Sequence, residues 1–497
     1  MNIAKAKEYV KQTVQLYLKK DEYGEYDIPV VRQRPIFLLG APGVGKTAIM
    51  EQVAQELNIA LVSYAMTHHT RQSALGLPVI KHKKYDGIET DVTEYTMSEI
   101  ISSMYECMEQ SGIKEGILFL DEINCVSETL APSMLQFLQY KEFGNRRIPE
   151  GWVVVTAGNP PEFNKSVREF DVVVMDRLKV LEVTPDYNSF RDYAYDKGIH
   201  PAIINFLDLK KEYFYLIENT VKGRSYVTAR GWEDLSQIIL KYEEAGLSVD
   251  ETLIEQYIRN TNVCKEFSAY YDLYQKYKRD YGVNEILKGE YSDESLSKAT
   301  KAGFDERLSL VGMLMDRVLK DMKDTVNLMD NLGALSAILK AVSAKIEGNE
   351  ADVDLIAEEL KKITDAKRAQ LLSLSKAGSL SRENENAIRY SIRFLEETRK
   401  EILANNLGFD FIKENYNSLV LDAKGRSKNV NNELHYAFEF ISKAFSDGNE
   451  MLIFVTNLTV NNASSAFLSR FPSDDYKKYH SELMIDQRHD DIVNRMK

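Results

Sequence analysis

In the stretch 36-IFLLGAPGVGKT-47, four apolar residues run directly into a loop with three glycines, a proline and a lysine. The apolar run has the length of a buried strand, and the following segment 46-KTAIMEQVAQEL-57 has the composition of a helix. Glycines let the backbone wrap around an anion with its N–H groups pointing inward, and a helix N-terminus adds a favourable dipole. The sequence therefore predicts a strand, a phosphate-binding loop and a helix.

The spacing within this loop narrows the ligand. From residue 40 to residue 47 it fits the pattern G-x-x-x-x-G-K-[ST], which binds nucleoside triphosphates. In that pattern Lys46 reaches the β- and γ-phosphates and the Thr47 hydroxyl ligates Mg²⁺. We therefore expect ATP and Mg²⁺ as cofactors. The residues expected to bind them are Gly40, Ala41, Pro42, Gly43, Val44, Gly45, Lys46, Thr47 and Ala48.

An acidic pair follows a second apolar strand. In 116-GILFLDEIN-124 the apolar residues deliver Asp121 and Glu122 to the carboxyl end of the strand, where open α/β sheets bind their ligands. Asp121 is expected to hold the magnesium shell together with Thr47. Glu122 is expected to orient and polarise the attacking water. The pair therefore predicts a metal site and a catalytic carboxylate for hydrolysis.

A third apolar strand ends in an amide. It lies in 153-VVVTAGNPPEFN-164 and leads to Asn159, which would hydrogen-bond the γ-phosphate or the attacking water. The Asn-Pro-Pro sequence is by itself also an ordinary turn signal. The prediction for Asn159 therefore depends on the two motifs that precede it.

The order of apolar runs along the chain indicates an α/β fold. Short runs separated by helix-length segments predict a parallel five-stranded sheet that is flanked by helices. After Pro185 the strand signal fades and helical patterns take over. We expect an α/β nucleotide-binding domain over 1–185, a helical lid over 186–250 and an all-α C-terminal extension over 251–497. The candidate strands are 36–39, 61–65, 117–120, 153–157 and 180–183, and a further helix is expected over 2–19.

Five segments, taken in their order, resemble the MoxR family of AAA+ ATPases: GAPGVGKT, FLDEIN, the strand end TAGNP, MDRLKVLEV and TARGWEDL. They lie within about the first 240 residues. The resemblance implies that Asn159 is sensor 1, that Arg177 is the arginine finger given to the neighbouring subunit, and that Arg230 is sensor 2 in the lid. Arg168 is the reserve candidate for the finger. The family further implies a ring, usually hexameric, and a partner that carries a von Willebrand factor A domain.

The segment 67–104 resembles the region where this branch inserts a small hairpin into its second helix. The insert is expected near 76–95, with strands 78-PVIKHKK-84 and 88-IETDVTEY-95 around a turn at Asp86-Gly87. The resemblance implies that this hairpin faces the central channel of the ring.

The C-terminal half is less informative. Residues 304–346 carry apolar side chains three or four positions apart, among them Met315 and Met322, which predicts one helical stripe. Such a stripe either binds a client or packs in a core, and packing is the commoner use. A break is expected at Gly348-Asn349, and the apolar segment 450–471 is expected to pack on the body of the protein.

Composition limits the classes of function. The formal net charge of −13 disfavours a broad basic surface, so nucleic-acid binding is not expected. The chain has no run of about 18 apolar residues, and its first residues are amphipathic rather than signal-like. We therefore expect a cytoplasmic location without membrane insertion. The three cysteines are far apart in the sequence and are read as reduced core thiols.

Together these features predict an ATP hydrolase that couples Mg-ATP hydrolysis to remodelling, assembly or maturation of a protein client. Two alternatives stay open at this point. One is a nucleic-acid-acting AAA+ motor of a defence or restriction system. The other is a nucleotide-gated scaffold whose output is assembly rather than turnover, against which the intact Glu122 argues.

Overall fold

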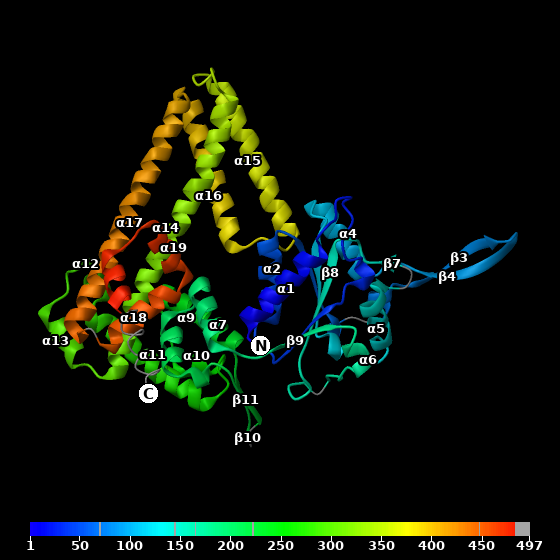
Figure 1. Ribbon diagram of the computed structural model, residues 1–497, viewed down its shortest axis with the longest axis horizontal. Coiled ribbons are helices and arrows are strands. Elements are labelled where there is room, and N and C mark those ends of the chain that lie inside the picture. Colours follow the sequence, from blue (N-terminus) through cyan, green and yellow to red (C-terminus); the bar gives the residue numbers. More distant parts are fainter. Residues whose placement is uncertain (69–70, 144–145, 165, 221–222, 447, 483–497) are drawn as a thin grey trace, which may run out of the picture. The chain divides into compact units, whose positions relative to one another are not determined.

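The computed structural model describes residues 1–482 except 69–70, 144–145, 165, 221–222 and 447 (Figure 1). The chain forms two compact units. The first consists of Met1–Ser189 together with Lys362–Ile392, and the second of Phe190–Lys361 together with Arg393–Lys497. Each unit is described separately below.

The first unit is built on a parallel sheet. All four strand pairings in it are parallel, and the strand order is β2-β5-β8-β1-β9. The carboxyl ends of all five strands therefore lie at one edge of the sheet. The strands are β1 (Ile36–Gly40), β2 (Ala60–Ala65), β5 (Gly116–Asp121), β8 (Trp152–Gly158) and β9 (Lys179–Val183). They confirm the five predicted strands and the predicted fold class.

Helices cover the sheet, and apolar residues make the contact. Leu118 and Leu120 on β5 are fully buried and share one core with Ile100, Met104 and other residues of the helices. The helices that lie wholly in this unit are α1 (Ile3–Tyr17), α2 (Lys46–Leu57), α3 (Arg71–Leu75), α4 (Glu99–Ser111), α5 (Ala131–Tyr140) and α6 (Val172–Met175). Short 3-10 turns occur at η1 (Val30–Arg32), η2 (Met66–His68) and η3 (Ile123–Cys125).

The predicted hairpin is present as β3 (Pro78–Tyr85) and β4 (Ile88–Tyr95). The two strands are antiparallel, and Tyr85 pairs with Ile88 across a two-residue turn. Asp86 and Gly87 have φ values of 48° and 87°, because a tight hairpin turn of this kind needs positive φ at both positions. Its strands are almost wholly exposed, and Figure 1 shows them extending away from the sheet. A second, very short hairpin consists of β6 (Glu142–Phe143) and β7 (Arg146–Arg147).

The second unit begins with the region in which the sequence predicts a helical lid. That region contains α7 (Tyr187–Lys197), most of which lies in this unit, α8 (Pro201–Leu209), η4 (Lys211–Tyr213) and α9 (Ala229–Ala245). It also contains a hairpin of β10 (Leu216–Thr220) and β11 (Gly223–Val227), which the helical prediction misses. Tyr226 and Val227 belong to the residue types that are enriched in strands, and Gly223 has a φ of 120°, which lies outside the helical region. The domain boundaries proposed from the sequence stay predictions.

The rest of the second unit is helical in its described residues. Met315 and Met322 of the long helix α14 (Phe304–Lys345) are buried against α17 (Phe409–Phe445) in one core, which supports packing as the use of the methionine stripe. Gly348 lies in the predicted break, with a φ of 81°. The remaining helices of this unit are α10 (Glu251–Glu255), α11 (Thr261–Tyr281), α12 (Val283–Lys288), α13 (Asp293–Lys301), α18 (Asn449–Val460) and α19 (Asn462–Arg470). Two further helices, α15 (Val353–Lys376) and α16 (Arg382–Asn405), have residues in both units.

The apolar segment over 450–471 packs on the body of its unit, as predicted. Phe454 of α18 and Phe467 of α19 are fully buried in the same core as α14 and α17. No single helix among the described residues is long and apolar enough to cross a membrane. Only α18 and α19 taken together, with an 82° bend between them, meet the criteria of length and composition.

Candidate nucleotide site

The loop after β1 has the backbone that its glycines allow. Gly43 and Gly45 adopt positive φ values of 75° and 95°, which side chains disfavour. Gly40 is needed for a different reason, since a Cβ atom there would lie 2.6 Å from the carbonyl oxygen of Val183 on the neighbouring strand β9. The loop leads directly into the N-terminus of α2 at Lys46. The predicted strand, loop and helix are therefore all present.

Lys46 turns back into the loop. Its Nζ atom donates hydrogen bonds to the carbonyl oxygens of Gly40 and Ala41, at 2.7 and 2.9 Å, and to Oδ1 of Asn159 at 2.9 Å. The side chain is buried, with 8% of its surface exposed. A buried ammonium group is costly unless it is well solvated by acceptors, and anionic oxygens would be stronger acceptors than carbonyls. The structure thus brings Lys46 and Asn159 together, although 113 positions separate them in the sequence.

Asp121 and Thr47 form the second pair. Asp121 ends β5 and accepts a hydrogen bond from the Thr47 hydroxyl at 3.1 Å, while its other carboxylate oxygen accepts from the backbone N–H of Glu122 at 2.9 Å. Hydroxyl and carboxylate oxygens suit Mg²⁺, which keeps several waters and takes few protein ligands. The described residues contain no group of three or more His, Cys, Asp or Glu side chains that could hold a metal ion. The donor set therefore fits magnesium bound together with a phosphate, and not a closed metal site.

Glu122 adopts a left-handed backbone, with φ 54° and ψ 36°. This conformation is uncommon for a residue with a side chain, and such strain is often found at functional sites. It turns the chain sharply at the end of β5 into η3. Asp121 thus still has the extended backbone of β5, whereas the next residue, Glu122, has a left-handed backbone.

Asn124 links the motifs in a way that the sequence does not reveal. Its side-chain amide donates to the carbonyl oxygen of Asn159 at 2.8 Å, and its own carbonyl oxygen accepts from the backbone N–H of Arg168 at 2.9 Å. A Cβ atom on Gly158 would lie 2.5 Å from Asn124 Oδ1, so that glycine makes room for the amide. Asn124 thus joins the end of β5 to the end of β8. A single polar residue in a short turn carries no sequence signal for this contact.

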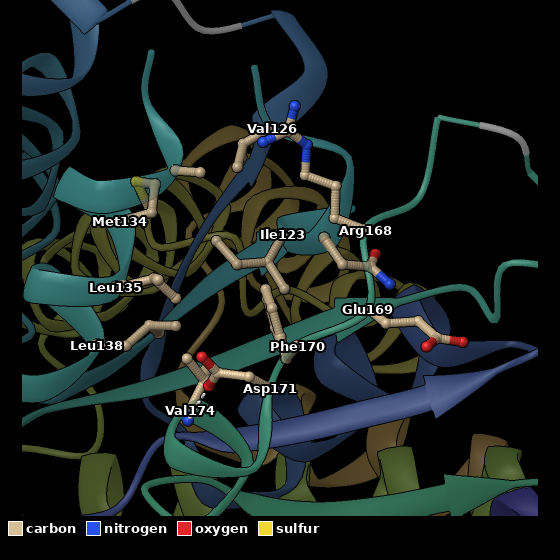
Figure 2. Close-up of a pocket in the computed structure, with 12 residues that line it drawn as sticks. Ile123, Val126, Met134, Leu135, Leu138, Arg168, Glu169, Phe170, Asp171 and Val174 are labelled. Carbon is tan, nitrogen blue, oxygen red and sulfur yellow. Dashed lines mark hydrogen bonds between the residues drawn. The ribbon is translucent and has the colours of Figure 1, made fainter. Parts of the chain in front are cut away.

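A cavity of about 210 Å³ lies beside Asn124 (Figure 2). Its walls are mostly apolar, from η3, α5 and the segment before α6, while Arg168 and Glu169 contribute charges. In Figure 2 the guanidinium of Arg168 lies near Val126, away from Leu138. Arg168 forms an ion pair with Glu128. The lining residues are Ile123, Asn124, Val126, Ala131, Met134, Leu135, Leu138, Arg168, Glu169, Phe170, Asp171 and Val174.

The two other predicted arginines are exposed. Arg177 lies in the turn between α6 and β9, and it has no ion-pair partner within the described part of its own chain. Arg230 lies in the first turn of α9, in the second unit. Arg177 thus belongs to the first unit, which contains Lys46, and Arg230 belongs to the second unit. Their predicted roles stay predictions.

The cysteines are free thiols. Burial raises the pKa of Cys125, and the negative charges of Glu122 and Asp121 raise it further. Burial likewise raises the pKa of Cys107 and, to about 11, that of Cys264. All three thiols are therefore poor nucleophiles at neutral pH. The site contains no activated cysteine among them.

Comparison with known proteins identifies the first unit's sheet region. Residues 35–178 match the family described as AAA domain (dynein-related subfamily). This segment contains the loop at Gly40, the acidic pair at Asp121 and the amide at Asn159. This part of the chain is similar to an AAA domain. Such domains are ATP-binding modules that in general hydrolyse the nucleotide, so the match supports ATP-driven activity and nucleotide binding with a divalent metal.

The remaining comparisons add little. A crystal structure of NtrX from Brucella abortus is similar at 16% sequence identity, with a TM-score of 0.23, over 40% of this chain and 40% of NtrX. A TM-score of that size bears on neither fold nor function, and the match spans less than half of the NtrX chain. No curated protein matches this chain.

Proposed function

We propose that this protein is a MoxR-like AAA+ ATPase that couples Mg-ATP hydrolysis to remodelling, assembly or maturation of a protein client. The observation that carries the proposal is the meeting of Lys46 with Asn159, at 2.9 Å, and of Thr47 with Asp121, at 3.1 Å, at one edge of the sheet. A magnesium-dependent phosphate site needs a cation, a polar sensor, a hydroxyl and a carboxylate. Local motifs in three different loops supply all four.

The chain's own residues divide the chemistry among them. Lys46 neutralises charge on the terminal phosphates, and the loop over 40–45 surrounds them with backbone N–H groups. Thr47 and Asp121 would hold Mg²⁺, which supplies Lewis-acid stabilisation of phosphate charge when it is bound. Glu122 positions and polarises the attacking water. Asn159 senses the terminal phosphate by exchanging its contact with Lys46 for one with the nucleotide. Asn124 in η3, which donates to the carbonyl oxygen of Asn159, responds to this change.

Ring assembly would complete the site. We assign Arg177 as the finger given to the neighbouring subunit, because it is exposed and lacks an ion-pair partner within the described residues of its own chain. Arg168 is less suited, since it is already paired with Glu128. Arg230 is assigned as sensor 2 in the lid. The family resemblance favours a hexamer and a partner with a von Willebrand factor A domain.

The β3–β4 hairpin is the proposed client-contacting element. Val79, Ile80 and Ile88 expose between 41% and 69% of their surface, although apolar side chains of this size are usually buried. Backbone pairing from Pro78–Tyr95 to Tyr85–Ile88 holds the two strands together, and the exposed ion pairs of Lys81 and Lys83 with Glu94 add little. A stable strand pair with exposed apolar residues suits contact with a protein. The net charge of −13 gives no support to a nucleic-acid client.

The proposal is tested with Lys46→Ala. Because this variant removes the charge that neutralises the phosphates, it should lose ATP binding in a titration with a fluorescent ATP analogue. The control is Lys141→Ala, which removes a different buried lysine and should keep ATP binding. The Nζ atom of Lys141 donates a hydrogen bond to the carbonyl oxygen of Leu138 at 2.5 Å. Lys46→Ala affinity within about threefold of the wild type, less than 1 kcal/mol, would contradict the assignment of the loop.

A further inference from the structure

The turn between α15 and α16 forms a backbone hydrogen bond with the open edge of the sheet. Strand β2 is the last strand on its side, so every second N–H group of β2 points away from β5. Ala60 donates toward β5, to the carbonyl oxygen of Glu115 at 2.9 Å, whereas Leu61 donates outward to the carbonyl oxygen of Ala377 at 2.8 Å. Ala377 directly follows the last residue of α15. The N–H group of Leu61 and the carbonyl oxygen of Ala377 have no partner within their own strand or helix. They form a hydrogen bond with each other instead.

The fit at this contact is tight. Ala377 is fully buried and belongs to the same apolar core as the sheet. Gly378 has a φ of 67°, and a Cβ atom there would lie 2.9 Å from the carbonyl oxygen of Leu61. Any other residue would therefore meet both a backbone strain and a collision with β2. The residues 373–379 are called the tip below.

The tip also contacts α4. The Ser373 hydroxyl donates to the carbonyl oxygen of Ser111, and the Cys107 thiol donates to the carbonyl oxygen of Lys376 at 3.7 Å. The exposed hairpin β3–β4 follows β2 and precedes α4 in the chain. The tip therefore contacts both β2 and α4, the strand and the helix that precede and follow the hairpin in the chain. Away from the tip, α15 and α16 continue into the second unit.

We propose that the tip is a coupling clamp that passes movement between the hairpin-bearing elements β2 and α4 and the helical C-terminal region. Strand β2 lies beside β5 with Ala65 opposite Asp121, so a change at the nucleotide site reaches the clamped strand through one row of backbone hydrogen bonds. Helices are stiff, so α15 and α16 carry a displacement along their length. The source of movement rests on the proposed ATP hydrolysis, whereas the clamp itself rests on the contacts above.

The contact of the tip with β2 and α4 includes a residue that weakens it. Ser379 is 1% exposed, and its hydroxyl has no hydrogen-bond partner among the residues that the structure describes. A buried hydroxyl without a partner costs free energy, and the proposed clamp predicts that undocking exposes Ser379 to water. Ser379→Ala should therefore tighten the clamp.

Docking is measured by the reactivity of Cys107 in the full chain with Cys125→Ser and Cys264→Ser. Burial and the contact with the tip slow the modification of this thiol by a maleimide. Gly378→Ala should make it about tenfold faster, because its Cβ atom collides with β2. Gly348→Ala is the matched control, since Gly348 has a φ of 81° but nothing within 4 Å of its Cβ position. Ser379→Ala should react several-fold more slowly than the parent.

Coupling is measured by hydrogen–deuterium exchange with and without Mg-ATP. In the parent and in Gly348→Ala, Mg-ATP should change hydrogen exchange both in the loop over 40–47 and in the helical segments 353–361 and 393–405 of the second unit. In Gly378→Ala only the loop should respond. Unchanged Cys107 rates in both Gly378→Ala and Ser379→Ala would overturn the clamp. Distant segments that still respond in Gly378→Ala, despite a reactive Cys107, would overturn coupling. If Mg-ATP leaves hydrogen exchange in the loop of the parent unchanged, the proposed ATPase and any coupling to it are refuted. The modification rates of Cys107 would still report the contact between the tip and α4.

Discussion

Asn159→Asp is expected to weaken ATP binding, whereas Asn159→Ala is expected to spare it. The Asn159 Oδ1 atom lies 2.9 Å from Lys46 Nζ. An aspartate is nearly the same size as asparagine, so it places a full negative charge beside the lysine that the phosphates need. The carboxylate then competes with the nucleotide for Lys46 and also repels the phosphates. Alanine removes the acceptor and leaves Lys46 available.

The size of the effect follows from this distance. Coulomb's law at an effective dielectric constant of about 20 gives roughly 6 kcal/mol for unit charges 2.9 Å apart. Loss of hydration cancels much of this attraction, and hydrogen bonds to charged groups retain about 1.5–3 kcal/mol. Each 1.4 kcal/mol changes Kd about tenfold, so Asn159→Asp should weaken ATP binding about 10- to 150-fold. Asn159→Ala should stay within about threefold while turnover falls, because the sensor is lost.

The assay is calorimetric titration of each variant with ATP and Mg²⁺, with turnover measured in parallel. Asn164→Asp is the matched control, because it makes the same charge change nearby. Its side chain contacts Cys125 and the backbone N–H of Ser166, not Lys46. Equal losses of affinity in Asn159→Asp and Asn159→Ala would refute competition for Lys46. An equal loss in Asn164→Asp would show a general effect of charge.

Three further predictions follow from other parts of the molecule. Glu122→Gln should bind ATP but lose a factor on the order of 10² or more in steady-state turnover, and retained turnover would show that another residue positions the water. Arg177→Ala mixed with Glu122→Gln should recover hydrolysis that neither shows alone; co-assembled rings without recovery would remove Arg177 from the site. Burial and the neighbouring Asp321 raise the pKa of Glu433 to about 7, so the folded state keeps this proton and loses stability as pH rises from the usual carboxyl range through 7. Glu433→Gln should therefore melt above the wild type at pH 8 and with it at pH 4, and a pH-independent difference would contradict this.

The sequence determined the parts of the protein that local chemistry encodes. The loop from Gly40 to Thr47 needs glycines and a lysine at fixed spacing, and the strands before it and before Asp121 are continuous apolar runs. The turn at Asp86-Gly87 needs two residues that accept positive φ. Each signal lies within about a dozen neighbouring residues, so the backbone conformation follows from the sequence that carries it. The hairpin β10–β11 was missed because its signal is shorter and weaker.

Which of these parts contact one another follows from the folded arrangement of the strands and helices, and not from any one segment. Lys46 contacts Asn159, and Asn124 contacts the backbone of Asn159, because β5, β8 and β1 are neighbours in the sheet. The order of the strands in the sheet cannot be inferred from the sequence of any one strand. The tip at Ala377 is the clearest case. Alanine, glycine and serine in a helical hairpin carry no periodic signal, and their contact with Leu61 uses backbone atoms that every residue possesses. Such a contact is specified by shape and by distance in space, and these exist only once the chain has folded.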